Sequence, residues 1–275
     1  MNCSETDLKY LRDVVLEESS NVVGASRNAQ FASRLAPIAR QAGASTLEDF
    51  VGMLRADRRT QLRRAVAEAM TINETSFFRD RRPFDALRDV ILPRLIERNA
   101  ATGRLRIWSA ASSTGQEAYS IAMLLCEHFP ELAAWDVTIL GTDISRQVID
   151  YARAARYRRL EVNRGLPVRM LLKYFIRDGE EWEIVPRVKT LCEFEQMNLR
   201  TPRAGLPLFD LVLLRNVLLY LPPQERSGVF ETAHGQMVAD GYLMLGAAEQ
   251  AEDSTKLFHA EFSRDCYFYR PAPTG

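Results

Sequence analysis

The fold depends on the stretch Leu105-Arg-Ile-Trp-Ser-Ala-Ala-Ser-Ser-Thr-Gly-Gln-Glu117, which predicts a buried strand, a turn of small residues and the start of a helix. The apolar residues of its first half can pack on both faces of a strand, and residues 112–115 leave the backbone accessible beyond it. In an α/β sheet, ligands bind at the carboxyl ends of the strands, where the amides of a helix N-terminus face the crevice. The stretch therefore predicts a nucleotide-like pocket.

Length and composition set the class of protein. The chain has 275 residues, 47% of them hydrophobic, which suffices for one sizeable core and a smaller unit. Lys and Arg number 36 against 36 Asp and Glu, so the net charge gives no overall electrostatic attraction to nucleic acid. A charged partner has to be recognised through a local patch of the surface. The four cysteines show neither disulfide nor metal-ligand spacing, which favours a reducing compartment and no metal. Without an apolar run of membrane-spanning length or a signal peptide, we expect a cytoplasmic protein that does not insert into the membrane.

Residues 1–95 carry helical patterns throughout and predict a small helical unit. Within it, Arg55, Arg59 and Arg63 follow one another at helical spacing, with Arg58 and Arg64 beside them. This row of guanidinium groups is either a solvated helix face or a docking surface for an acidic partner. The pattern alone leaves both interpretations open.

After the opening strand, the chain repeats a strand–helix order. A helix follows it, then a second strand over residues 135–142, then Asp143 and a helix over residues 145–155. This order predicts a right-handed parallel sheet, in which an acidic residue at the end of the second strand can bind ribose hydroxyls. The spacing from Gly115 to Asp143 exceeds the roughly 20 residues of the dinucleotide fingerprint, and the turn lacks its glycines. A nicotinamide cofactor is therefore disfavoured.

The C-terminal half predicts an insertion and then the return of the main sheet. Residues 173–194 alternate β-prone runs around Asp178-Gly179, which indicates a small antiparallel insertion. An apolar central strand is expected at residues 209–216, a helix from Pro222-Pro223 to about residue 238, a buried strand at 242–246 after an Asp240-Gly241 turn, and short β pieces at 261–263 and 266–270.

Several separated segments together resemble one family, the CheR-type chemotaxis receptor methyltransferases. They are Thr71-Ile-Asn-Glu-Thr-Ser-Phe-Phe-Arg79, Trp108-Ser-Ala-Ala-Ser-Ser-Thr-Gly-Gln-Glu-Ala-Tyr-Ser120, Gly141-Thr-Asp-Ile-Ser145, Phe194-Glu-Gln-Met-Asn-Leu199 and Phe209-Asp-Leu-Val-Leu-Leu-Arg-Asn216. The resemblance implies an α/β, Rossmann-like S-adenosylmethionine-dependent methyltransferase fold with a mostly parallel seven-stranded sheet. It further implies a helical domain with a connecting helix over residues 1–95, a methyltransferase domain over 96–275, and the antiparallel insertion at 173–194 within it.

The resemblance also implies a site for S-adenosylmethionine, with S-adenosylhomocysteine as product. Its residues would be Asn73, Thr75, Arg79, Glu117, Asp143, Asn198, Leu199, Arg215 and Asn216. Asp143 would hold the ribose hydroxyls, Glu117 would attract the ammonium of the methionyl group, and Asn198 with Leu199 would contact adenine. Alternatively, Asn198 or Asn216 satisfies backbone groups at a turn, and Thr75 caps a helix.

By the same resemblance, the reaction transfers a methyl group to glutamates on the cytoplasmic helices of chemoreceptors. Arg79 and Tyr220 would orient the accepting carboxylate, although Tyr220 could instead be a core aromatic residue. The arginines at 55, 58, 59, 63 and 64 would dock the acidic receptor. We expect a monomer. Two other functions stay open: a methyltransferase acting on nucleic acid, and a non-catalytic sensory module that binds S-adenosylmethionine.

Overall fold

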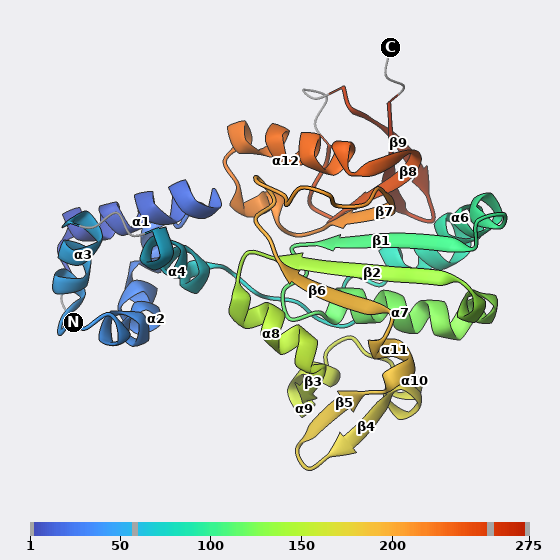
Figure 1. Cartoon of the computed structure of the whole chain (residues 1–275), viewed down its shortest axis with the longest axis horizontal. Coiled ribbons are helices and arrows are strands. Elements are labelled where there is room, and N and C mark those ends of the chain that lie inside the picture. The colour runs from blue at the N-terminus through green and yellow to red at the C-terminus, as the bar shows by residue number, and fades with distance from the viewer. Residues whose placement is uncertain (1–2, 57–59, 252–255, 273–275) are drawn as a thin grey trace. The chain divides into compact units, whose positions relative to one another are not determined.

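The computed structural model describes residues 3–56, 60–251 and 256–272 (Figure 1). The chain separates into two compact units. The first, here called the helical unit, comprises Met1–Ile72 together with Leu218–Arg226. The second, the sheet unit, comprises Asn73–Val217 and Ser227–Gly275.

The helical unit is held together by the apolar faces of its helices. Its elements are α1 (Glu5–Ser19), η1 (Ala25–Arg27), α2 (Asn28–Gln41), α3 (Leu47–Ala56), α4 (Thr60–Met70) and η4 (Leu218–Tyr220). Ser4 caps α1, because its side chain accepts a hydrogen bond from the amide of Asp7 at 3.1 Å. Phe31 and Phe50 are fully buried in the core. The segment Leu218–Arg226 also belongs to this unit, and the Val22 amide donates a hydrogen bond to the Tyr220 carbonyl at 2.8 Å.

This unit ends at Ile72, earlier than the helical region predicted through residue 95. The reason is that Phe77, Phe84 and Leu92 are buried in the core of the sheet unit. The connecting helix that the resemblance implied is divided into α5 (Arg82–Ala86), a π-helical turn η2 (Leu87–Ile91) and α6 (Leu92–Asn99). Pro93 lacks an amide proton, which accounts for a break in the regular hydrogen-bond ladder at this place.

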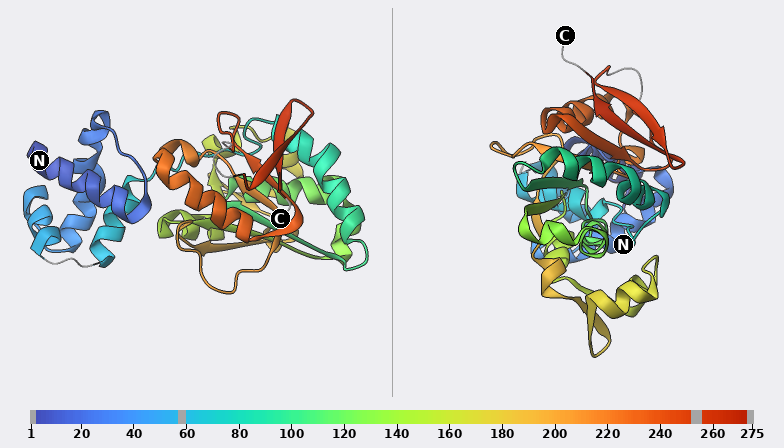
Figure 2. Two further views of the ribbon diagram at one scale, coloured as in Figure 1. Left: turned by 90° about the horizontal axis from the view of Figure 1, so that it is seen from above. Right: turned by 90° about the vertical axis from the view of Figure 1, so that its right-hand side faces the viewer.

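The main sheet has seven strands, as the resemblance implied, and their order is β6-β2-β1-β7-β8-β10-β9. They are β6 (Cys192–Gln196), β2 (Asp136–Asp143), β1 (Arg104–Ala110), β7 (Phe209–Leu214), β8 (Met237–Leu245), β10 (Cys266–Pro271) and β9 (Phe258–Ser263). The first five strands are mutually parallel, and β10 pairs antiparallel with β8 on one side and with β9 on the other. The hairpin of β9 and β10 forms one edge of the sheet (Figure 2). The predicted turn at residues 240–241 lies inside β8, where the register against β7 shifts.

Helices and short turns connect these strands. They are α7 (Gln116–His128), η3 (Pro130–Ala134), α8 (Arg146–Ala154), α9 (Arg159–Val162), α10 (Val168–Tyr174), α11 (Pro186–Lys189) and α12 (Pro223–Gly235). Helix α7 is buried along most of its length, which explains why its sequence is apolar on nearly every face. Within the described ranges, no helix combines the length and the hydropathy needed to cross a bilayer.

The small antiparallel sheet exists, but its strands differ from those predicted. Its order is β3 (Arg156–Arg158), β5 (Glu181–Ile184) and β4 (Phe175–Asp178), and it lies with α9, α10 and α11 beneath the main sheet in Figure 1. The hairpin turn at Gly179 has the expected positive φ of 61°. The prediction was wrong for residues 192–194, the end of the predicted insertion, because they belong to β6, which pairs with β2 in the main sheet. Phe194 accounts for this, because its ring is buried in the core of the sheet unit.

Candidate functional site

The five parallel strands place their carboxyl ends at one edge of the main sheet, and the residues beyond those ends form the candidate site. Predicted site residues follow four of them: Glu117 after β1, Asp143 at the end of β2, Asn198 and Leu199 after β6, and Arg215 and Asn216 after β7. These residues are up to about a hundred positions apart in sequence. The sheet topology alone brings them to a common edge.

Asp143 is oriented by the backbone around it. Its side chain is buried, one carboxylate oxygen accepts from the Ser113 amide at 3.0 Å, and the other accepts from the Ser145 amide at 3.0 Å. These two amide bonds, one to each carboxylate oxygen, fix the direction of the side chain. The group is therefore suited to accept hydrogen bonds from the two hydroxyls of a ribose.

The turn between β1 and α7 has an unusual backbone. Ala111, Ser113 and Gly115 all have positive φ, at 60°, 50° and 91°. A side chain at Gly115 would be strained by this φ, and its Cβ would lie 2.9 Å from the Cβ of Ala152. Such strain is characteristic of functional sites. The hydroxyl of Ser113 donates to the Asn73 carbonyl at 2.9 Å and so ties the turn to a second predicted site residue.

Arg215 is the buried centre of a charge network. Its guanidinium donates to the Glu117 carboxylate at 2.8 Å, to the Asp80 carboxylate at 3.0 Å and to the Arg79 carbonyl at 3.1 Å. The second oxygen of Glu117 accepts from the Ser109 hydroxyl at 2.7 Å. The Arg215 side chain is only 1% exposed, and its Nε is buried with no hydrogen-bond partner among the described residues. An orphaned buried donor of this kind indicates a site for an external acceptor.

Glu249 fixes the end of β7 against the end of β8. One of its oxygens accepts from the Asn216 amide at 2.6 Å and from the Gly246 amide at 2.8 Å. Asn216 has a φ of 56°, and a Cβ at Gly246 would lie 2.6 Å from the Glu249 carboxylate. Sequence reasoning missed both Glu249 and Asp80. Asp143 could be predicted from the sequence because it is the last residue of a strand, whereas Glu249 lies four residues beyond the end of β8.

The remaining predicted site residues are half-buried, and they differ in their hydrogen bonds. Arg79 is half-buried and donates to the Glu74 carbonyl at 2.9 Å. The Asn198 side chain accepts from the Arg200 amide at 3.0 Å, so it does support a turn, as one of the two interpretations held. Thr75 and Leu199 are half-buried, and Thr75 lies outside any helix. Tyr220 is half-buried in the helical unit, so its catalytic role stays a prediction.

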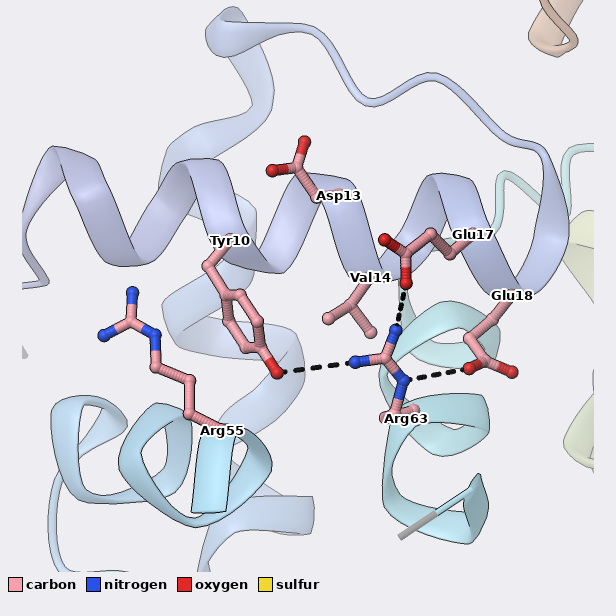
Figure 3. A pocket seen from close by; sticks show the side chains of 7 residues that line it. All are labelled: Tyr10, Asp13, Val14, Glu17, Glu18, Arg55 and Arg63. Atoms are coloured by element: carbon pink, nitrogen blue, oxygen red, sulfur yellow. Dashed lines mark hydrogen bonds and ion pairs between the residues drawn. The ribbon is translucent and has the colours of Figure 1, made fainter. Parts of the chain in front are cut away.

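The arginine row of the helical unit is partly occupied by internal contacts (Figure 3). Arg63 pairs with Glu17 and Glu18, the latter at 3.0 Å, and only 13% of its side chain is exposed. Arg55 pairs with Asp7 at 2.8 Å. Arg64 is exposed, and Arg58 and Arg59 lie outside the described residues. A cavity of about 510 Å³ is lined by Arg55 and Arg63 together with residues of α1, among them Asp13, Glu17 and Glu18.

The chemistry of the edge fits S-adenosylmethionine. Asp143 suits a ribose, the Arg215–Glu117 pair carries the two signs of charge that a zwitterionic amino-acid group requires, and Arg215 Nε has no hydrogen-bond partner among the described residues. In the part of the chain that the structure describes, no cluster of three or more His, Cys, Asp or Glu side chains could hold a metal ion. Fold and site thus define an S-adenosylmethionine-dependent methyltransferase.

Comparison with known proteins identifies the family. Residues 73–266 match the family model of the CheR methyltransferase, SAM binding domain. Chemotaxis protein methyltransferase 1 of Pseudomonas aeruginosa is 37% identical, over 90% of this chain and 92% of its own length. Chemotaxis protein methyltransferase Cher2 of Pseudomonas putida is 35% identical over the same shares, and the chemotaxis protein methyltransferase of Vibrio parahaemolyticus is 38% identical over 86% of each chain. The chain belongs to the CheR methyltransferase family.

Proposed function

We propose that this enzyme transfers a methyl group from S-adenosylmethionine to glutamate side chains on the cytoplasmic helices of chemoreceptors, forming methyl esters for sensory adaptation. The names of the relatives, which match the chain over most of its length, carry the receptor assignment. The site residues at the carboxyl edge of the sheet support the methyl donor. The proposal places the enzyme in the cytoplasm, where the receptor helices lie.

The accepting glutamate needs no general base. Its reference pKa of about 4.3 makes it an anion at neutral pH, and S-adenosylmethionine supplies the electrophilic methyl group. Carboxylate and sulfonium neutralise each other as the new bond forms, so a poorly solvated site favours the charge-dispersed transition state. The enzyme's part is therefore to position the reactants and exclude water. In this proposal Asp143 holds the ribose and the Arg215–Glu117 pair holds the amino-acid end.

Arg79 is the residue we assign to the substrate carboxylate, together with Tyr220 as the resemblance implies. The backbone on both sides of Arg79 is fixed. The Phe78 amide donates to the Ser120 hydroxyl at 2.9 Å, and the Arg79 carbonyl accepts from Arg215. Phe78 and Asp80 have positive φ values of 48° and 68°. A strained turn that is held in place by buried partners is a means of presenting one side chain precisely.

The first test is direct. We expect labelled S-adenosylmethionine, incubated with the enzyme and a chemoreceptor cytoplasmic fragment, to yield base-labile methyl ester on the fragment. A parallel incubation with generic DNA and RNA should leave the nucleic acid unlabelled. Cofactor binding without any ester would instead identify a non-catalytic sensory module, and label on nucleic acid would identify the other alternative.

A test of the docking role of the arginine row has to use an arginine of the row that is exposed. Arg64 is exposed and lies on α4, so Arg64→Glu should raise the KM for the receptor fragment about tenfold without changing the affinity for S-adenosylhomocysteine. Lys9→Glu is a matched control, because Lys9 is an exposed cation of the same unit outside the row. An equal KM for both variants would contradict docking through α4.

Arg63 is expected to behave differently, because its pairs with Glu17 and Glu18 join α4 to α1. Arg63→Gln should lower the free energy of unfolding by about 2 kcal/mol. Urea denaturation of both variants measures this, and Arg64→Glu should unfold close to the parent protein. Equal stability of the two variants would show that the Arg63 pairs contribute nothing.

A further inference from the structure

The small antiparallel sheet packs two aromatic rings against the turn that carries Arg79. We call residues 156–189, from β3 to α11, the inserted segment (Figure 1). Tyr157, the middle residue of β3, and Phe175, the first residue of β4, meet the ring of Phe77 edge-on, with centroids 5.0 and 5.5 Å away. All three rings are buried, and edge-to-face contact is a favoured geometry for aromatic pairs. The inserted segment therefore fixes the backbone two residues before Arg79.

The hydroxyl of Tyr157 contacts a second turn of the site. It donates to the Thr114 carbonyl at 2.7 Å, in the turn between β1 and α7. The neighbouring Ser113 amide in that turn binds Asp143. Burial raises the pKa of Tyr157 well above the value of a free phenol, so the hydroxyl remains a donor at physiological pH. One side chain thus contacts both turns, one with its ring and the other with its hydroxyl.

Gly165 makes a separate contact with the turn that carries Arg79. It follows α9 in the chain, its φ is 84°, and a Cβ placed on it would lie 2.1 Å from the Phe77 carbonyl oxygen. Gly179 of the same segment also has a positive φ, of 61°, but no described atom lies within 4 Å of a Cβ placed there. Gly165 is therefore required by a close approach of two backbones and not only by its φ.

Both turns need such support, because Ser113 and Phe78 have strained φ values of 50° and 48°. We propose that Tyr157 and Gly165 are positioning residues, through which the inserted segment aligns the turn beside the methyl donor with the turn that orients the accepting carboxylate. They act through Thr114 and Phe77 and not on the reactants. The part that concerns the acceptor rests on the proposed function. Alignment matters because a misplacement of about 1 Å can cost about 100-fold in rate.

Tyr157→Phe tests the donor side. It keeps the ring but leaves the buried Thr114 carbonyl unpaired, so we expect the Kd for S-adenosylhomocysteine to rise about tenfold, with the KM for a chemoreceptor cytoplasmic fragment within twofold of the parent. Tyr174→Phe is the matched control, because Tyr174 is a fully buried tyrosine of the inserted segment whose hydroxyl donates to Glu127, near the far end of α7, at 2.7 Å. Its Kd should stay within twofold of the parent. Isothermal titration calorimetry measures both, and equal affinities of the two variants would overturn the role of Tyr157.

Gly165→Ala tests the acceptor side. Its Cβ has to displace the Phe77 carbonyl, so kcat should fall about 100-fold while the Kd for S-adenosylhomocysteine stays within threefold of the parent. Gly179→Ala is the control, since it carries a comparable φ without the clash, and it should keep the kcat of the parent.

Equal kcat values for Gly165→Ala and Gly179→Ala would overturn the role of Gly165. If urea denaturation shows that Gly165→Ala does not fold, Phe77→Leu replaces it. That variant removes the ring between Tyr157 and Phe175, and it has to lower kcat at least tenfold for the proposal to hold. Absence of ester with the parent enzyme would overturn the proposed function, whereas the calorimetric comparison of Tyr157→Phe with Tyr174→Phe would still decide the donor side.

Discussion

Asp143→Ala is expected to weaken binding of S-adenosylhomocysteine about 100-fold. Two hydrogen bonds from ribose hydroxyls to a charged acceptor contribute about 1.5 kcal/mol each, and about 3 kcal/mol corresponds to this factor. The substitution also releases the Ser113 and Ser145 amides, each held at 3.0 Å by the carboxylate. The turn between β1 and α7 is then no longer held in place, which lowers the affinity for S-adenosylhomocysteine further. Isothermal titration calorimetry with S-adenosylhomocysteine measures the effect.

A conservative substitution sharpens this experiment. Asp143→Asn keeps one acceptor oxygen but places an amide NH₂ group opposite one of the two backbone amides, where donor would face donor. We therefore expect Asp143→Asn to bind only slightly better than Asp143→Ala. Asp150→Ala is the control, because Asp150 is an exposed carboxylate on α8, one helix further along the chain. Affinity of Asp143→Ala within threefold of the parent would show that the ribose lies elsewhere.

The fold could be predicted largely because its signals are local. The change from helical to strand period near Leu105, and the alternation of strands and helices after it, define a parallel sheet without any long-range information. The errors fall where local signals are weak. Strand β6 reads Cys-Glu-Phe-Glu-Gln, a polar edge strand with one buried ring, and β3 has only three residues. Their partners are fixed by tertiary packing, which a short polar pattern does not encode.

The site divides in the same way. Asp143 could be predicted because it stands at a strand end, whereas Glu117 was predicted from the family resemblance of the segment in which α7 begins. The residues that hold the site in shape, Asp80 and Glu249, could not be predicted. Asp80 is 135 positions from its partner Arg215, and Glu249 is 33 positions from its partner Asn216. Asn216 and Glu249 meet because β7 and β8 end at the same edge, and Asp80 reaches Arg215 from the turn before α5. The sequence shows which residues bear charge, but the fold decides which charges meet.

Arg215→Met is the second substitution with a large expected effect. It leaves Glu117, whose side chain is 14% exposed, without its cation in a buried position. Breaking a buried pair from one side costs about 3–5 kcal/mol, and the loss should come mainly from Glu117, since Asp80 is 37% exposed and solvent screens its charge. Urea denaturation measures the loss of stability. Methyl transfer to the receptor fragment should fall below detection, because the turn that carries Arg79 loses its anchor and the methionyl group loses its guanidinium.

A second variant separates the structural cost from the loss of binding. Arg215→Met/Glu117→Gln removes the uncompensated charge, so most of the lost stability should return. Cofactor affinity should not return, because neither the orphaned guanidinium donor nor the carboxylate is restored. If the double variant recovers both stability and affinity for S-adenosylhomocysteine, the network is only a structural support and the amino-acid end binds elsewhere. If it recovers stability alone, the Arg215–Glu117 pair binds the methyl donor itself.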